Sequence, residues 1–324
     1  MSSIPRVVLV AMAGVAWRAQ ASAEPLAMST YPVGLHPEVS SVRAVGALKF
    51  RGGLDLRSRD IRFGGLSALA ISRSGDRLLS LTDKGNWVEI SPTYGPSGNL
   101  FGIGEAWIGA LDNLGSGSIN GSRLGDVEAI APTDDGYAVS FEGRHRLWLY
   151  RRDRVTRLIQ PRPLRSPRGL HRAPSNGGIE ALATLADGRL FALTEELEAD
   201  TNHMLGWVTQ GRNWQALRYR RTGRFVPTGA TTLANGDLLV LERRFTWLGG
   251  FASRIVRLRH EDIRANATLD GSEVATIDLP LTVENFEGIA VRSLPEGGAH
   301  IYLISDDNFH VLQRTLLLMF EYRG

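Results

Sequence analysis

The 324-residue sequence predicts an all-β protein, because one strand–turn–strand unit recurs five times and no helical 3.6-residue pattern separates the copies. Each copy contains a short apolar strand, a turn with Gly, a second apolar strand and an acidic residue. The five copies run from Gly65 to Asp83, Asp126 to Glu142, Gly178 to Glu195, Pro227 to Glu242 and Asn285 to Asp306. Repeats of about 50 residues are typical of four-stranded blades, so we expect a β-propeller.

The turns support a hairpin in each copy. Asp135-Gly136, Asp187-Gly188 and Asn235-Gly236 lie between apolar runs, and Asp-Gly or Asn-Gly is the strongest short-range hairpin signal. The first and last copies turn at Ser74-Gly75-Asp76 and at residues 295–298. Alignment on these turns gives one equivalent position in every copy, which is occupied by Ser67, Glu128, Glu180, Thr228 and Glu287.

Two strand-like segments lie outside the five copies, at Val42–Phe50 and Gln313–Tyr322. If they pair in one blade, the ring closes and no exposed sheet edge is left. We therefore expect six blades, with five or seven as alternatives.

The N-terminus predicts export. Arg6, an apolar run from Val7 to Trp17 and the sequence Ala21-Ser22-Ala23 resemble a secretory signal peptide cleaved after Ala23. This interpretation leaves a propeller domain over residues 24–324, in the periplasm or secreted. The alternative is a buried first helix. No other apolar run approaches the roughly 20 residues of a membrane span.

Composition excludes several functions. The chain has no cysteine, which rules out disulfides, thiolate metal sites and cysteine nucleophiles. Its 37 basic and 34 acidic residues nearly balance, so nucleic acid is not an expected partner. The motifs of serine hydrolases, zinc proteases and nucleotide-binding proteins do not occur.

The repeated acids are the candidate site. The innermost strand of each blade follows the central channel, so Glu128, Glu180 and Glu287 should belong to one ring, with Ser67 and Thr228 supplying hydroxyls. These glutamates lie between apolar neighbours, where an unpaired charge is costly, so pairing or metal binding is expected. The alternative is that they satisfy backbone groups between blades. Ligands that are all oxygen suit a hard cation, Ca²⁺ or Mg²⁺.

A second set of acids ends the following strand of each copy, and basic residues accompany it. The set is Asp83, Glu142, Glu195 with Glu196, Glu242, and Asp306 with Asp307. Lys84 follows Asp83, while His145 and Arg146 come soon after Glu142 and Arg243 follows Glu242.

Several segments resemble the phytase-like family of bacterial proteins, described as having an esterase-like activity of phytase. They are Glu-Ala-Leu-Ala at 180–183, Leu-Glu-Arg-Arg-Phe at 241–245, Phe-Glu-Gly-Ile-Ala at 286–290 and Ile-Ser-Asp-Asp-Asn-Phe at 304–309. The resemblance covers residues 48–320 and implies a propeller with a phosphoester-cleaving role. By matching motifs, it implies site residues at Glu128, Glu180, Glu242, Glu287, Asp306 and Asp307.

The resulting hypothesis is an exported, metal-dependent phosphoesterase-like hydrolase that acts on a small-molecule ester. We predict that Ca²⁺ is held at the channel by Glu128, Glu180, Glu287, Asp306, Asp307 and Asp83. Glu142 or Glu242 is the predicted general base, and Lys84, Arg146 and Arg243 are predicted to bind substrate. One alternative is a calcium-dependent lactonase or esterase, in which His145 helps to position water. Another is a non-catalytic propeller that binds a ligand or a protein around a structural cation.

Overall fold

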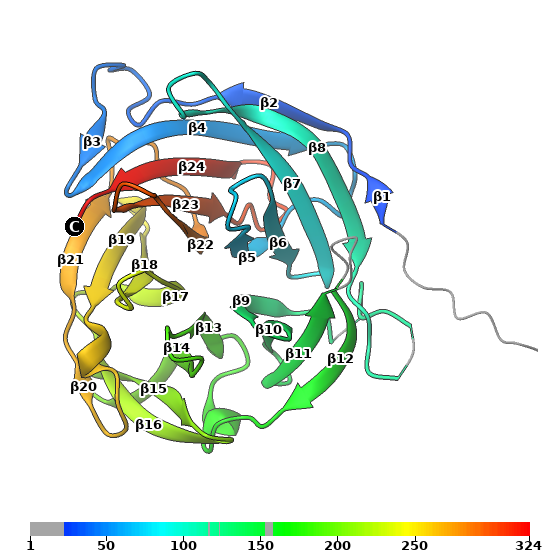
Figure 1. Ribbon diagram of the computed structural model, residues 1–324, viewed down its shortest axis with the longest axis vertical. Helices are drawn as coiled ribbons and strands as arrows, with labels where there is room; N and C mark the ends of the chain where they lie inside the picture. The colour runs from blue at the N-terminus through cyan, green and yellow to red at the C-terminus, as the bar shows by residue number, and fades with distance from the viewer. Residues whose placement is uncertain (1–22, 116, 123, 153–157) are drawn as a thin grey trace, which may run out of the picture.

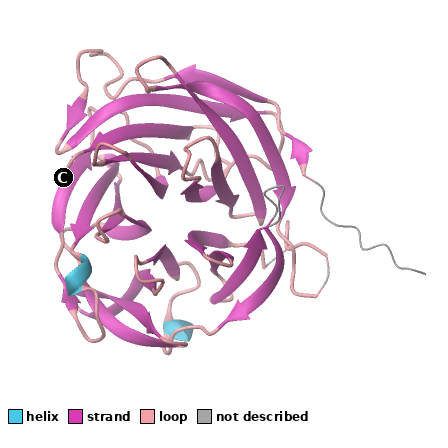
Figure 2. Ribbon diagram, viewed as in Figure 1, coloured by secondary structure: helices cyan, strands magenta, loops and turns pink. Residues whose placement is uncertain are grey.

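The computed structural model describes residues 23–115, 117–122, 124–152 and 158–324, which form five β-sheets arranged around a central axis (Figure 1). The predicted signal peptide lies outside the described residues except for Ala23. Figure 2 shows that strands dominate the described chain, with two single-turn 3₁₀ helices at its periphery, Leu170–Arg172 and His260–Asp262. No helix among the described residues has the length and apolar character needed to cross a membrane.

Each sheet is one blade of the propeller, built outward from an inner strand. Blade 1 contains β5 (Leu66–Ile71), β6 (Leu78–Thr82), β7 (Asn86–Tyr94), β8 (Leu100–Ala110) and β1 (Glu24–Pro25). Blade 2 contains β9 (Val127–Thr133), β10 (Gly136–Phe141), β11 (Arg146–Arg152) and β12 (Leu158–Leu164). Blade 3 contains β13 (Ile179–Thr184), β14 (Leu190–Asp200), β15 (His203–Gln210), β16 (Asn213–Arg220) and β20 (Thr268–Leu269).

The last two blades complete the ring. Blade 4 contains β17 (Val226–Thr232), β18 (Leu238–Thr246), β19 (Gly250–Leu258) and β21 (Ser272–Ile277). Blade 5 contains β22 (Phe286–Ser293), β23 (Ala299–Ser305), β24 (Thr315–Tyr322), β4 (Leu48–Ser58) and β2 (Met28–Pro32), with β3 (Ala44–Val45) beside β4. The strands from the two ends of the chain therefore share one sheet.

The propeller has five blades, so the prediction of six is wrong. The two end segments do pair with each other, as Phe320 of β24 opposite Phe50 of β4 shows. However, β24 also pairs with β23, where Leu303 lies opposite Leu318. The end segments therefore extend the sheet of the fifth hairpin instead of building another blade.

The core lies between neighbouring blades. Leu241 of blade 4 and Leu303 of blade 5 belong to one fully buried cluster, and Leu69 of blade 1 and Ile304 of blade 5 belong to another. Burying one such side chain contributes about 1.5–3 kcal/mol. The second cluster joins the first blade to the last, so packing closes the ring.

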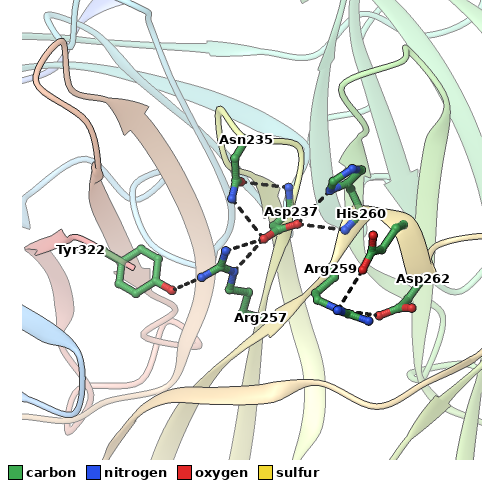
Figure 3. A network of polar contacts seen from close by, with 8 residues as sticks. Asn235, Asp237, Arg257, Arg259, His260, Asp262 and Tyr322 are labelled. Atoms are coloured by element: carbon green, nitrogen blue, oxygen red, sulfur yellow. Dashed lines mark hydrogen bonds and ion pairs between the residues drawn. The ribbon is translucent and has the colours of Figure 1, made fainter.

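A polar network also fastens blade 4 to blade 5 (Figure 3). Asp237, in the turn between β17 and β18, accepts a hydrogen bond from Arg257 Nε at 2.8 Å and from the backbone N–H of His260 at 3.0 Å. Burial opposes ionisation, but these donors lower the pKa of Asp237 to about 2. Arg257 reaches onward to the Tyr322 hydroxyl at 3.2 Å, in the last strand of blade 5.

Every inner strand has a β-bulge at the same point. In each blade the pairing between the inner strand and its neighbour shifts by one residue, which leaves one residue outside the ladder. These residues are Ser67, Glu128, Glu180, Thr228 and Glu287, the equivalent position identified in the sequence. Because a bulge re-aims the side chain that it carries, it turns this position toward the channel in all five blades.

Candidate functional site

The five bulged residues surround one narrow cavity at the centre of the propeller. Its volume is about 10 Å³, near the minimum for one water molecule. The Ser67 hydroxyl donates to the carbonyl of Val127 at 2.5 Å, and the Thr228 hydroxyl donates to the carbonyl of Phe286 at 3.2 Å. In these two blades the hydroxyl satisfies the backbone of a neighbouring blade. In the other three the position carries a carboxyl.

A second ring lies beside the first. In four blades the residue that follows the last ladder pair between the second strand and the inner strand donates its backbone N–H to the carbonyl of the residue just before the inner strand, at 2.9–3.0 Å. These pairs are Asp83 to Gly65, Glu142 to Asp126, Glu195 to Gly178 and Asp306 to Asn285. In blade 4 the equivalent residue is Arg243, which pairs with Val226. The second ring is therefore Asp83, Glu142, Glu195, Arg243 and Asp306.

Glu242 occupies a different position from the one predicted. It pairs with Pro227, one residue before the ring position, and its side chain is fully buried. Its carboxylate accepts hydrogen bonds from Arg254 Nε at 2.6 Å and from the Tyr219 hydroxyl at 2.9 Å. The structure thus places Glu242 between blades 3 and 4, where its carboxylate is buried and bound by Arg254 and Tyr219, which does not favour its predicted role as general base.

Arg243 joins three blades at the channel. Its Nη2 donates to Glu195 Oε1 at 2.6 Å, and its Nη1 donates to Glu287 Oε1 at 2.8 Å and to Asn285 Oδ1 at 2.6 Å. Burial alone would lower the pKa of Arg243, but the charges of Glu287 and Glu195 raise it. Arg243 was predicted to bind substrate, and its two terminal nitrogens are instead engaged by protein groups.

Glu180 and Glu195 form a carboxyl pair next to this arginine. Both are buried, and their side chains hydrogen bond to each other. Burial and the charge of Glu195 raise the pKa of Glu180 well above its usual range. Two neighbouring carboxylates repel each other, so the raised pKa of Glu180 favours its protonated form.

Three further carboxyls gather at blade 2. Single oxygens of Asp126, Glu128 and Glu142 all lie within 4.8 Å of one another. Burial raises the pKa of Asp126, and burial together with the Glu142 charge raises that of Glu128 well above normal. Burial also raises the pKa of Glu142 to about 7. Such a cluster either binds protons or is neutralised by a cation.

His145 lies beside this cluster with a fixed orientation. Its Nε2 is 2.9 Å from the carbonyl of Pro174, which can only accept, so Nε2 carries the proton. Its Nδ1 is buried and has no hydrogen-bond partner among the described residues. A methyl group added at Gly178 would lie 2.6 Å from His145 Nδ1 and 3.3 Å from Glu142 Oε1, so this ring nitrogen and this carboxylate flank the same glycine.

Two other predicted ligands belong to the second ring. Burial and the charges of Asp306 and Glu287 raise the pKa of Asp83. Burial also raises the pKa of Asp306, although its Oδ1 accepts a hydrogen bond from the backbone of Asn308 at 2.6 Å. Asp83 and Asp306 thus add to the excess of acid at the channel mouth.

The remaining predicted site residues have other contacts. Asp307 accepts hydrogen bonds from the backbone of Gly65 at 2.9 Å and from the Thr315 hydroxyl at 3.0 Å, so it holds two loops together. Lys84 lies with its Nζ 3.1 Å from the ring centroid of Phe309. The structure does not bring either residue into the two rings.

Arg146 is stacked within blade 2. Its guanidinium lies 4.0 Å from the Phe141 ring centroid and 4.6 Å from that of Trp148, and it donates to the carbonyl of Leu124. Burial lowers its pKa to about 10, while the nearby Asp126 charge opposes this shift. Arg146 therefore contributes positive charge behind the carboxyl cluster.

Sequence reasoning did not select Asp126 as a site residue. It lies two residues before Glu128 in the second copy, and Asn285 lies two residues before Glu287 in the fifth. Comparing these two copies position by position would have shown a polar residue at the same place. The structure puts both beside the second ring.

The sequence matches a family model that covers these rings. The model, phytase-like with the description esterase-like activity of phytase, matches residues 61–309, a span that includes all five inner strands. The chain belongs to the phytase-like family. This assignment confirms the resemblance noted from the repeated motifs, and it supports a hydrolase function for the propeller. No curated protein matches the sequence.

Solved structures of similar shape are distant in sequence. The PQQ-bound aldose sugar dehydrogenase from Streptomyces coelicolor is 13% identical with a TM-score of 0.46, over 92% of this chain and 99% of that one. The α-L-arabinofuranosidase from Podospora anserina, in complex with cellotriose, is 10% identical with a TM-score of 0.46, over 86% and 98%. A Bacteroides thetaiotaomicron protein of unknown function is 11% identical with a TM-score of 0.47, over 91% and 77%.

Proposed function

We propose that this member of the phytase-like family is a cation-dependent ester hydrolase that prefers anionic esters, in particular phosphoric esters. The observation that carries the proposal is the convergence of Asp126, Glu128 and Glu142, with one oxygen of each inside a 4.8 Å group. Carboxyls at this separation repel one another when ionised, and a bound cation removes that cost.

The donor set fits Ca²⁺. Calcium takes oxygen ligands at about 2.3–2.6 Å, so two ligands of one ion lie up to about 5 Å apart. Asp126, Glu128 and Glu142 would hold the ion. Bound calcium supplies positive charge that attracts and neutralises an anionic ester. Mg²⁺ demands a more regular octahedral shell and is the weaker candidate.

The Glu180–Glu195 pair supplies the acid and the base. The ionised carboxyl can accept a proton from an attacking water, and the protonated one can donate to the leaving group. Arg243 holds Glu195 at 2.6 Å, which fixes one member of the pair. A raised pKa for Glu180 favours the protonated state that an acid needs.

The orientation of His145 favours a second candidate function, the hydrolysis of uncharged carboxylic esters or lactones. With its proton on Nε2, the unpartnered Nδ1 is a proton acceptor next to Glu142. In this alternative His145 would position water, and negative charge on the substrate would not be required.

The test compares three substrates under two conditions. An aryl phosphomonoester, an aryl phosphodiester and an aryl carboxylic ester are incubated with the purified protein, with Ca²⁺ and after chelation, beside Glu142→Gln. The exposed Asp187→Asn serves as control. We expect chelator-sensitive turnover of a phosphoric ester that Glu142→Gln removes and Asp187→Asn retains.

Other outcomes of this test point elsewhere. Turnover of the carboxylic ester alone would favour the His145 alternative. If no substrate is turned over and calcium only raises the melting temperature, the protein is a non-catalytic propeller with a structural cation.

Export is part of the proposal and rests on the predicted signal peptide. Expressed with its full N-terminus, the protein should appear in the periplasm or medium beginning at Glu24, and intact mass would show this. A protein retained in the cytoplasm with residues 1–23 attached would refute it.

A further inference from the structure

A pocket opens beside Arg243 at the channel mouth. It has a volume of about 470 Å³ and lies between the β18–β19 hairpin, Glu195 of β14 and the loop that follows β23. Glu195 and Arg243 of the second ring are part of its wall. The pocket is therefore continuous with the proposed catalytic carboxyls, and its size is that of sites for small organic ligands.

One side of this pocket is aromatic. Phe245 and Phe251 line it, with ring centroids 4.9 Å apart, and Trp247 packs edge-on to Phe245 at 5.9 Å. Phe245 is 51% exposed although it lies next to a charged site. Exposed aromatic rings that face a pocket are suited to hold a flat apolar group.

The pocket wall carries three guanidinium groups, two of which are paired with carboxylates. Arg224, Arg243 and Arg244 line the pocket and Glu195 is the carboxylate beside them. Arg244 pairs with Asp278 at 2.7 Å. Arg224 is exposed and has no hydrogen-bond or ion-pair partner among the residues that the structure describes. It is free to bind an anion at the mouth.

We propose that this pocket is a substrate subsite for the aryl group of an anionic aryl ester with one phosphate, and that Arg224 attracts the anionic group to the channel mouth. The inference rests on the proposed function and narrows it. A polyol carrying many phosphates has no flat apolar group for Phe245 and Phe251, so the pocket indicates a different substrate class within phosphoric esters.

Binding of two non-hydrolysable probes tests the subsite. Phenylphosphonate and methylphosphonate carry the same anion and differ in the aryl group. By calorimetric titration we expect phenylphosphonate to bind at least about tenfold more tightly. Phe245→Ala and Phe251→Ala should each reduce that preference. Arg224→Ala should weaken the binding of both probes to the same extent.

Leu248→Ala is the matched control. Leu248 lies on the same hairpin and is fully exposed, but it does not line the pocket, so its loss should leave binding of both probes unchanged. Equal binding of the two probes, binding of neither, or an aryl preference that survives both Phe substitutions would overturn the subsite.

Failure of the subsite and failure of the hydrolase can be told apart. An aryl preference that depends on Phe245 and Phe251, in a protein that hydrolyses no ester, would retain the subsite and reject catalysis. Ester hydrolysis without any aryl preference would retain catalysis and reject the subsite.

Discussion

Arg243 and Glu287 form an ion pair across the boundary between blades 4 and 5, with Nη1 2.8 Å from Oε1. The same guanidinium reaches Glu195 of blade 3 at 2.6 Å. The Arg243 guanidinium is therefore shared by carboxylates of two other blades at the point where they face the channel. Its side chain is 23% exposed, so water screens the pairs only in part.

Removing the positive charge of Arg243 should destabilise the protein strongly. Arg243→Gln leaves Glu195 and Glu287 without their partner, and breaking a buried pair on one side costs about 3–5 kcal/mol. We expect the free energy of unfolding, measured by urea denaturation of the purified protein, to fall by about 3 kcal/mol, near the lower end of this range. Arg259→Gln is the control, since its pairs with Glu261 and Asp262 are exposed and should contribute little to stability. Equal losses in the two variants would contradict the bridging role.

Calcium should stabilise the fold through blade 2. A ligand that binds only the native state at 100 times its Kd adds about 2.7 kcal/mol. Added Ca²⁺ should therefore raise the melting temperature, and Glu128→Gln or Asp126→Asn should remove most of that increase. Asp187→Asn, a surface carboxylate paired with Arg189, should retain it. If the calcium-dependent rise in melting temperature persists in both Glu128→Gln and Asp126→Asn, the cation binds at another site.

Glu180→Gln should separate catalysis from metal binding. The amide retains a hydrogen bond to Glu195 but cannot act as a proton donor to the leaving group in place of the Glu180 carboxyl, so turnover should fall about 10²–10⁴-fold, the usual contribution of general acid–base catalysis. The calcium-dependent rise in melting temperature should persist, because Glu180 is not in the Asp126–Glu128–Glu142 group. If Glu180→Gln hydrolyses substrate at the wild-type rate, the Glu180–Glu195 pair has no role in catalysis.

The repeated hairpins made the propeller predictable, because short apolar runs and Asp-Gly or Asn-Gly turns are local features of the chain. The number of blades could not be predicted in this way, because it depends on which strands the two end segments pair with. Both Phe50 and Phe320 have the character of buried strand residues. Only the ladder from β23 to β24 shows that they extend the fifth sheet.

The acidic rings were predictable in part for the same reason. Glu128, Glu180 and Glu287 share a position that alignment of the turns reveals, whereas the choice between Glu242 and Arg243 depends on a bulge. A shift of one residue moves a side chain to the opposite face of a strand. The pairing of Pro227 with Glu242 settles that choice, and no local feature of the sequence indicates it.

His300 should make the stability depend on pH in a defined interval. It is 5% exposed in β23, and Arg292 Nη2 lies 3.1 Å from its Nδ1, which must accept. Burial and the charges of Arg292 and Arg51 lower its pKa from 6.5 to about 4. Since the folded pKa is below the unfolded one, this contribution to stability is complete above pH 6.5 and is lost as the pH falls toward 4.

One pKa unit corresponds to about 1.36 kcal/mol, so the loss at pH 4 should amount to roughly 3 kcal/mol. His300→Asn keeps an acceptor near Arg292 and removes the titration. The free energy of unfolding, measured from pH 8 to pH 4, should therefore fall less steeply in His300→Asn than in the wild type. His171→Asn, at an exposed position, should follow the wild type. If His300→Asn and the wild type lose stability in parallel over this interval, His300 is not buried in its neutral form, and the packing of β23 against Arg292 must differ from that described.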